Sequence, residues 1–315
     1  MEPDLTAATP PEDWDANQFA AQLGAPTATP GPQDPGGLEA SLATARASMV
    51  GDPPSMSPPS DGEVTLCRGL SNDDEWQRVA YMREVNGADE EALSRFDLGK
   101  ANALFTYWDT LLARTTIRLG NIDIENLSLG ARQQKLGQLL LGDREAMYLG
   151  LVRATWGDVR TVEGVGCPHC GNVTDYGIAL TDTEQHKSDF PFQTLDDPDQ
   201  TYFELKLRRG DTVEVRLPTG ADMAVLSTLW KSDPSPAERN TQMLGRLVYT
   251  HNGTPVQDPV AFAKGLSSPD RQTVTAFIVD KQPGPRLGGV MTSCASCEET
   301  FFLELGLARL LQLAT

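Results

Sequence analysis

Two Cys-x-x-Cys pairs offer the clearest chemistry in this sequence. The first pair is Cys167 and Cys170, and the second is Cys294 and Cys297. A Cys-x-x-Cys segment with glycine nearby can form a knuckle that presents two thiolates to one metal ion, and structural Zn2+ takes four ligands in a tetrahedron. One pair leaves the ion half coordinated. The two pairs together therefore predict one structural zinc site with four cysteine ligands, joining positions 127 residues apart.

Other states of these cysteines stay open at this point. They could be unligated or form disulfides, and Cys167-Pro168-His169-Cys170 matches the active-site tetrapeptide of periplasmic thiol oxidases. Those enzymes stabilise the first thiolate at a helix N-terminus, whereas residues 171–177 have poor helical character. A cytosolic thiol-disulfide oxidoreductase using Cys167 and Cys170 is thus the alternative function. His169 is expected to point away from a shared metal, and Cys67 to be a buried thiol at a strand end.

The rest of the chain offers few groups for catalysis. It has three histidines, His169, His186 and His251, and the last precedes Asn252-Gly253, a predicted turn. We find no glycine-rich phosphate loop and no carboxylate pair at helical spacing in an apolar setting. These features favour a protein that is not an enzyme, with a zinc-ribbon protein–protein adaptor as a further alternative.

Composition narrows the class of partner. The chain of 315 residues has 26 Lys+Arg against 44 Asp+Glu, a formal charge of -18. Binding to nucleic acid depends on Lys and Arg displacing counterions, so nucleic acid and anionic membranes are not expected as partners. No stretch approaches the roughly 20 apolar residues of a membrane span, and the acidic start is unlike a signal peptide. We expect synthesis in a reducing cytoplasm. Cysteines there more often act as metal ligands or reactive thiols than form disulfides.

Residues 1–60 are predicted to form a Pro/Ala-rich acidic arm, largely disordered alone. They hold 11 of the 22 prolines, with eight acids and one base, too few apolar groups to offset the entropy of ordering. Two short stretches have apolar residues at helical spacing and are either linear motifs for partner proteins or chance patterns in a solvated tail. Their candidate partner-binding residues are Trp14, Phe19, Leu23, Leu38 and Leu42.

The folded part reads as two copies of one unit. Asp143-Arg144 precedes Cys167 by 24 and 23 residues, and Asp270-Arg271 precedes Cys294 by the same intervals. We predict an α+β fold with a first repeat over 61–182, a linker over 183–202 and a second repeat over 203–315. Each repeat would be a strand-plus-helices unit ending in a zinc knuckle, and the two knuckles would share one four-cysteine zinc ribbon.

The patterns also predict individual elements. A short strand over 64–67 would run into a helix capped by Ser71 that carries Trp76, Val79, Ala80 and Met82, and strand 63–66 would match 212–217 in the second repeat. Helices are expected over 101–115, 129–140 and 143–155, the last two divided near Gly142. Alternation predicts a hairpin of 203–207 with 213–217, and a strand after each cysteine pair over 176–180 and 301–305.

The order of these features resembles the T4-type phage baseplate hub and baseplate assembly proteins of contractile-tailed phages and related contractile injection systems. The resemblance covers about 61–315 and rests on a Leu-rich helix ending in Gly-Asp-Arg, Trp156-Gly157, Cys-x-x-Cys-Gly, Leu217-Pro218-Thr219-Gly220 and a closing Cys-x-x-Cys with Phe301-Phe302. The arm of 60 residues departs from the simplest family pattern.

The resemblance implies a non-enzymatic structural or assembly component of a baseplate hub. Its implied partners are other hub, spike and tube-initiating proteins, with several copies in a larger assembly. After cytoplasmic synthesis the chain would be incorporated in a phage tail or injection-system particle. The metal role carries over only to the four paired cysteines. A transient assembly factor and a resident component both stay open.

Overall fold

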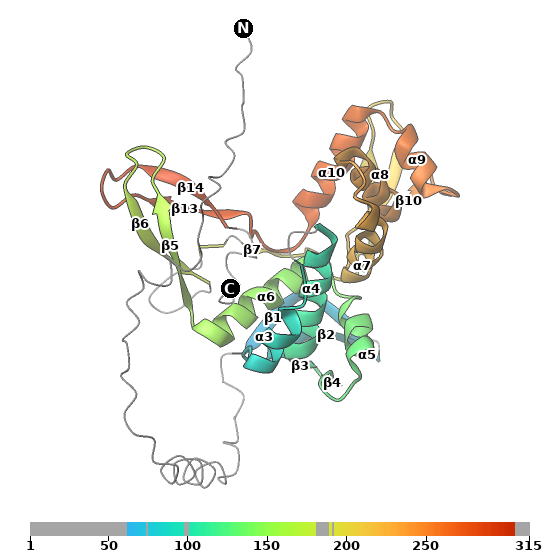
Figure 1. Cartoon of the computed structure of the whole chain (residues 1–315). Helices are drawn as coiled ribbons and strands as arrows, with labels where there is room; N and C mark the ends of the chain where they lie inside the picture. Colours follow the sequence, from blue (N-terminus) through green and yellow to red (C-terminus); the bar gives the residue numbers. More distant parts are fainter. Residues whose placement is uncertain (1–61, 74, 98–100, 181–188, 191, 306–315) are drawn as a thin grey trace, which may run out of the picture. The chain divides into compact units, whose positions relative to one another are not determined.

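The computed structural model describes residues 62–73, 75–97, 101–180, 189–190 and 192–305. Over these residues the fold is mixed α+β, with eight α-helices and several small sheets (Figure 1). The predicted arm with Trp14, Phe19, Leu23, Leu38 and Leu42 lies outside the described residues, as do residues 183–188, with His186, and 191 of the predicted linker.

Ten elements occur in the same order twice along the chain. The first series is β1 (Glu63–Asn72), β2 (Glu75–Met82), α3 (Gly87–Leu93), α4 (Ala101–Thr115), β3 (Thr116–Leu119), β4 (Ile122–Asp123), α5 (Leu129–Leu136), α6 (Leu141–Trp156), β5 (Val159–Gly166) and β6 (Val173–Ala179). The second is β8 (Tyr202–Lys206), β9 (Thr212–Arg216), α7 (Gly220–Leu229), α8 (Pro236–Leu247), β10 (Val248–His251), β11 (Thr254–Pro255), α9 (Pro259–Gly265), α10 (Ser268–Lys281), β13 (Gly289–Ser293) and β14 (Thr300–Glu304). A 3-10 turn, Trp230–Ser232, follows α7.

The sheets repeat in the same way. Each series forms a four-stranded antiparallel sheet, in the orders β1-β2-β3-β4 and β8-β9-β10-β11. Each then ends in a two-stranded hairpin, β5–β6 or β13–β14. A short pair of β7 (Phe192–Gln193) and β12 (Gly284–Pro285) lies outside both series. The two series therefore share strand order as well as element order.

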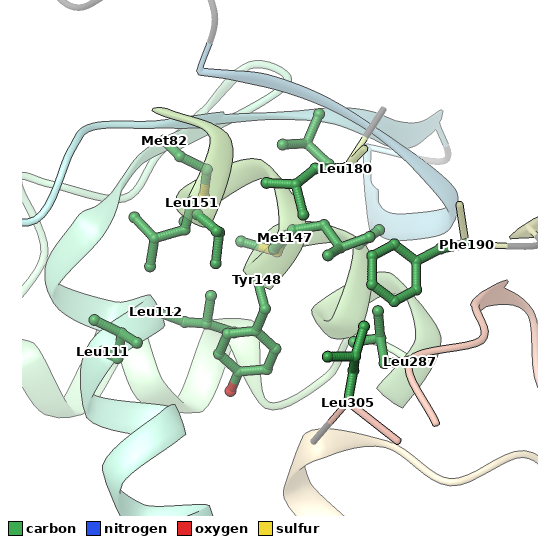
Figure 2. Packing of buried hydrophobic residues seen from close by; sticks show 14 of the residues in the cluster. Met82, Leu111, Leu112, Met147, Tyr148, Leu151, Leu180, Phe190, Leu287 and Leu305 are labelled. Atoms are coloured by element: carbon green, nitrogen blue, oxygen red, sulfur yellow. The ribbon is translucent and has the colours of Figure 1, made fainter. Parts of the chain in front are cut away.

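Each of the two hydrophobic cores contains side chains from both series. The larger cluster contains the first sheet, α4 and α6, and it also takes side chains from both hairpins, including Leu303 of β14. Figure 2 shows Leu287 and Leu305 of the second series beside Tyr148 of α6. The smaller cluster is built from the second series but includes Leu140, from the loop before α6. Burial of apolar surface thus ties each series to the other.

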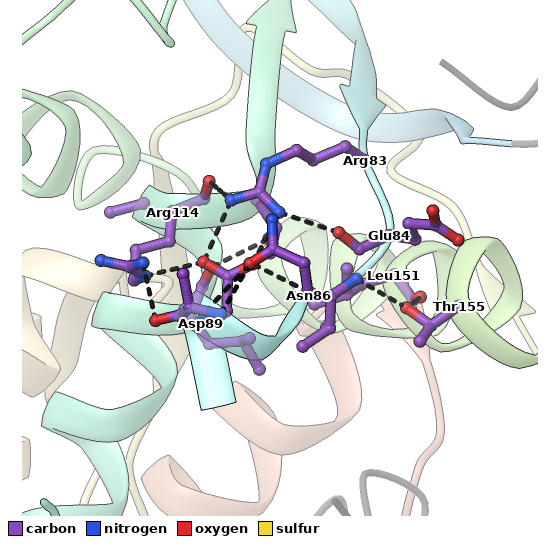
Figure 3. Close-up of polar contacts among 12 residues, drawn as sticks. Arg83, Glu84, Asn86, Asp89, Arg114, Leu151 and Thr155 are labelled. Atoms are coloured by element: carbon purple, nitrogen blue, oxygen red, sulfur yellow. Dashed lines mark hydrogen bonds and ion pairs between the residues drawn. The ribbon is translucent and has the colours of Figure 1, made fainter. Parts of the chain in front are cut away.

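Buried carboxylates hold the helices of both series in the same way. Asp89 in α3 is fully buried and pairs with Arg83 Nη1 at 2.6 Å and Arg114 Nε at 2.8 Å (Figure 3). It also completes a capping box with Asn86. The first turn of α3 is thereby fixed both to the strand end before it and to the last turn of α4.

Asp222 in α7 repeats this arrangement. It pairs with Arg216 Nη1 at 2.6 Å and Arg246 Nε at 2.9 Å, and it completes a capping box with Thr219. Burial alone would raise the pKa of Asp222, but the hydrogen bonds from Arg216 and the Thr219 amide lower it to about 2. Both series therefore use a buried Asp between two arginines, a feature that the sequence patterns did not reveal.

One predicted helix was wrong. Residues after Ser71 form strand β2, because Asp73 turns the chain with a positive φ of 51° and Trp76, Val79 and Tyr81 favour extended backbone. Strand β1 is correspondingly longer than predicted, and Cys67 lies inside it rather than at its end. The match of 63–66 with 212–217 was also wrong, since the counterpart of β9 is β2.

Most other predicted elements are confirmed. Helix 101–115 is α4, the hairpin of 203–207 with 213–217 is β8–β9, and the strands after the cysteine pairs are β6 and β14. Asn252 and Gly253 form the expected turn between β10 and β11, both with positive φ. The division near Gly142 falls slightly earlier, because α5 ends at Leu136 and α6 already begins at Leu141.

Candidate metal centre

The structure brings the four paired cysteines together. Cys167 and Cys170 lie in the turn between β5 and β6, and Cys294 and Cys297 lie in the turn between β13 and β14. All four sulfur atoms lie within 4.8 Å of one another. Tyr176 and Phe301 pack edge to face across the two hairpins, with ring centroids 5.7 Å apart. The predicted candidate ligands thus meet at one point, held by apolar packing between the hairpins.

The sulfur spacing fits a tetrahedral ion. Cys167 Sγ lies 3.8 Å from Cys297 Sγ, and Cys170 Sγ lies 3.7 Å from Cys294 Sγ. Four sulfurs about 2.3 Å from a central Zn2+ would be about 3.8 Å apart along each edge of the tetrahedron. A disulfide needs a separation of about 2.05 Å. The arrangement is therefore compatible with a metal site, and all five cysteines are free thiols.

Backbone hydrogen bonds shape the first knuckle. The amide of Cys167 donates to Asn172 O at 2.8 Å, and the amide of Gly171 donates to Cys167 O at 2.9 Å. The amide of His169 lies 3.4 Å from Cys167 Sγ, where it can donate to the sulfur. Gly171 has a φ of 72°, a conformation that glycine adopts without strain. The turn therefore points the His169 amide toward the first thiol.

The second knuckle repeats each of these hydrogen bonds, between residues that lie 127 positions later in the sequence. The amide of Cys294 donates to Glu299 O at 3.0 Å, that of Glu298 to Cys294 O at 2.9 Å, and that of Ser296 to Cys294 Sγ at 3.4 Å. Amides of Ser296 and Cys297 lower the pKa of Cys294 to about 6. The fold thus favours the thiolate form at Cys294, whereas desolvation and the neighbouring thiols raise the pKa of Cys297 to about 12.

In each Asp-Arg pair upstream of the cysteines, the Asp carboxylate connects secondary-structure elements. Asp143 accepts hydrogen bonds from the amides of Cys67 at 2.5 Å and Gly69 at 2.8 Å, which fixes the start of α6 to β1. In the second series Asp270 accepts from the amide of Arg208 at 3.0 Å and from the hydroxyl of Ser267. Each carboxylate therefore anchors the helix that leads into a hairpin to the first strand pair of its own series.

Cys67 is not part of the four-cysteine cluster, and none of the described histidines belongs to it. Cys67 Sγ can donate to Gln193 O at 3.5 Å, and burial raises the pKa of its thiol to about 12. After Cys170 the chain enters strand β6, so Cys167 lacks the helix N-terminus that activates thiol oxidases. Among the described residues, no other group of three or more His, Cys, Asp or Glu side chains has ligand spacing for a metal.

No helix in the described part of the chain is both long enough and apolar enough to cross a membrane. Comparisons with protein-family models, curated protein sequences and solved structures gave no match.

Proposed function

We propose that Cys167, Cys170, Cys294 and Cys297 bind one structural Zn2+ ion that joins the two series of elements. The observation that carries this proposal is the spacing of about 3.8 Å between sulfurs of opposite hairpins. When bound, the ion would supply four metal–sulfur bonds between segments that are distant in sequence. Four thiolates would complete its coordination, so no position would remain for a reacting water or substrate. This favours a structural role over a catalytic one.

Metal analysis of the purified full chain tests the zinc proposal. We expect one zinc per chain in the wild type and in Cys67→Ser, which changes the fifth cysteine. We expect the zinc to be lost or greatly weakened in Cys294→Ser and in Cys170→Ser. Equal zinc content in all four proteins would overturn the proposal, and so would full thiol-disulfide reductase activity in a zinc-free wild type.

The two series are further proposed to be copies of one unit. The shared element order, the shared strand order and the buried Arg–Asp–Arg cluster of each copy support this. The offset between equivalent residues is 127 in the hairpins but 133 between Asp89 and Asp222. Small insertions between the elements account for the difference, and they explain why the upstream segments do not align without a gap.

The biological setting proposed is the baseplate hub of a contractile tail or contractile injection system. The chain would act there as a non-enzymatic structural or assembly component. Support comes from the resemblance of residues 61–315 to that family and from the structural character of the cysteine cluster. With a charge of -18, the chain would bind partners that present basic or apolar surfaces, as expected for contacts with hub, spike and tube-initiating proteins.

Particle analysis tests this setting. Mass spectrometry of purified contractile particles and of their assembly intermediates should detect the chain in at least one of the two. Presence in intermediates alone would identify an assembly factor, and presence in mature particles a resident component. Absence of the chain from both would contradict the proposed baseplate setting. It would not affect the zinc proposal.

A further inference from the structure

A cavity of about 640 Å³ opens beside helix α10 in the second series. Three aromatic side chains line it: Phe277 of α10, Phe203 of strand β8 and Phe192 of β7. The rings of Phe203 and Phe277 meet edge to face with centroids 6.2 Å apart, and Phe192 is 52% exposed. The cavity therefore presents aromatic rings to any group that enters it.

Three carboxylates line the same cavity. They belong to Asp196, Asp197 and Glu204, all of which are exposed. Among the described lining residues, Lys281 is the one with a positive charge. Between residues that the structure describes, no ion pair involves any of these four side chains. The cavity thus combines aromatic walls with an excess of negative charge.

Strand pairing adds a further negative charge next to the cavity. Glu204 lies directly opposite Glu214 in the register of β8 and β9, so the two side chains lie on the same face of the sheet. Like charges at such a pair repel each other and destabilise the sheet. The Thr250 hydroxyl donates to the Glu214 carboxylate at 2.7 Å, but this neutral donor leaves the charge in place. A cation bound beside Glu204 would relieve the repulsion.

The aromatic ring of Phe277 is a feature of the second series alone. At the position 127 residues earlier, helix α6 has Gly150, where an added Cβ would lie 2.0 Å from Val64 Cγ2 of strand β1. In the first series the helix therefore packs its backbone directly on the edge strand of its sheet. In the second series the equivalent position of α10 presents a ring to the cavity.

We propose that this cavity binds an arginine side chain of a partner protein. A planar guanidinium group can stack on a phenylalanine ring while its N–H groups donate to carboxylates, and the cavity offers both kinds of partner. An apolar side chain would instead bury the carboxylates without compensation. A basic partner also complements the formal charge of -18. The inference goes beyond the zinc site and does not depend on the baseplate setting, because it uses the cavity alone.

Calorimetric titration of the full chain at low salt tests the proposal. The probe is a short capped peptide in which alanine and arginine alternate. We expect saturable binding that is about tenfold weaker in the double variant Asp196→Asn/Asp197→Asn and about threefold weaker in Phe277→Leu. The matched control is Glu90→Gln/Glu91→Gln, which removes the same charge from two adjacent, exposed carboxylates of α3 outside the cavity. It should bind the peptide as the wild type does.

A second peptide isolates the charge of the ligand. Citrulline has nearly the same shape as arginine but is neutral, so the peptide with citrulline at both arginine positions should bind about tenfold or more weakly. Equal binding of the two peptides would overturn the proposal, and so would a wild type that binds neither. Equal weakening in Asp196→Asn/Asp197→Asn and in the control would also overturn it, since the effect would then come from net charge alone. The exposed acid variants should unfold thermally at the wild-type temperature, so that weaker binding reports the cavity and not a loss of fold.

Discussion

Cys170 Sγ lies 3.7 Å from Cys294 Sγ, although the two residues are 124 positions apart. The second such contact, between Cys167 and Cys297, also crosses from one hairpin to the other. Each thiol therefore has a close neighbour on the opposite hairpin as well as a partner in its own turn. A metal bound at this point would hold the two hairpins to each other, and each would depend on it.

Metal removal should loosen both hairpins together. A two-stranded hairpin is marginally stable alone, so we expect chelation to raise hydrogen exchange in residues 159–179 and 289–304. Exchange in α4 should change much less, because this helix packs mainly on α5 and α7 rather than on the hairpins. Loosening of one hairpin without the other would contradict a shared ion. Re-addition of zinc should restore the protection of both.

Removing the charge of buried Asp222, in the second copy, should lower the stability of the fold. Asp222→Asn leaves two arginines without their carboxylate, although both keep some exposure to water. We expect the free energy of unfolding to fall by about 2 to 3 kcal/mol, measured by urea denaturation. Asp233→Asn is the control: its ion pair with Arg239 is exposed, and its loss should cost less than about 0.5 kcal/mol. Equal effects would refute a structural role for Asp222.

The same carboxylate should make stability depend on pH in acid. The pKa of Asp222 falls from 3.8 to about 2 in the folded protein, so its contribution is complete above the unfolded value. It is lost as the pH falls through the folded value, and amounts to about 2 kcal/mol. We therefore expect the stability gap between wild type and Asp222→Asn to be constant above about pH 5 and to shrink toward pH 2. A gap that does not change over this range would contradict the assignment.

Contact between the two copies can be tested at a glycine. A Cβ at Gly142 would lie 1.5 Å from Pro283 O, so the start of α6 is in close backbone contact with the segment just after α10. Gly142→Ala should destabilise the protein by about 2 kcal/mol or more in thermal unfolding. Gly130→Ala, inside α5 with no atom within 4 Å of the added Cβ, should stabilise it by about 0.5 kcal/mol. If Gly142→Ala is as stable as Gly130→Ala, this contact is absent.

The sequence predicted the parts that local patterns determine. Two Cys-x-x-Cys pairs preceded by Asp-Arg at equal intervals indicated a shared centre, and alternation identified β8–β9. Residues 75–82 were harder, because Trp76 and Ala80, four residues apart, fit both a helical and an extended period. The Asp89 and Asp222 clusters could not be predicted, since each depends on an arginine that only the packing of a later helix brings close. The interlocked cores were missed for the same reason.

The coordination shell of the bound metal tests the central claim most directly. X-ray absorption at the zinc edge of the full chain, purified without added metal, should show four sulfur ligands at about 2.3 Å and no nitrogen or oxygen ligand. This result would establish that all four cysteines of the two hairpins meet at one ion. A shell with fewer than four sulfurs, or a chain that carries no zinc, would contradict the account.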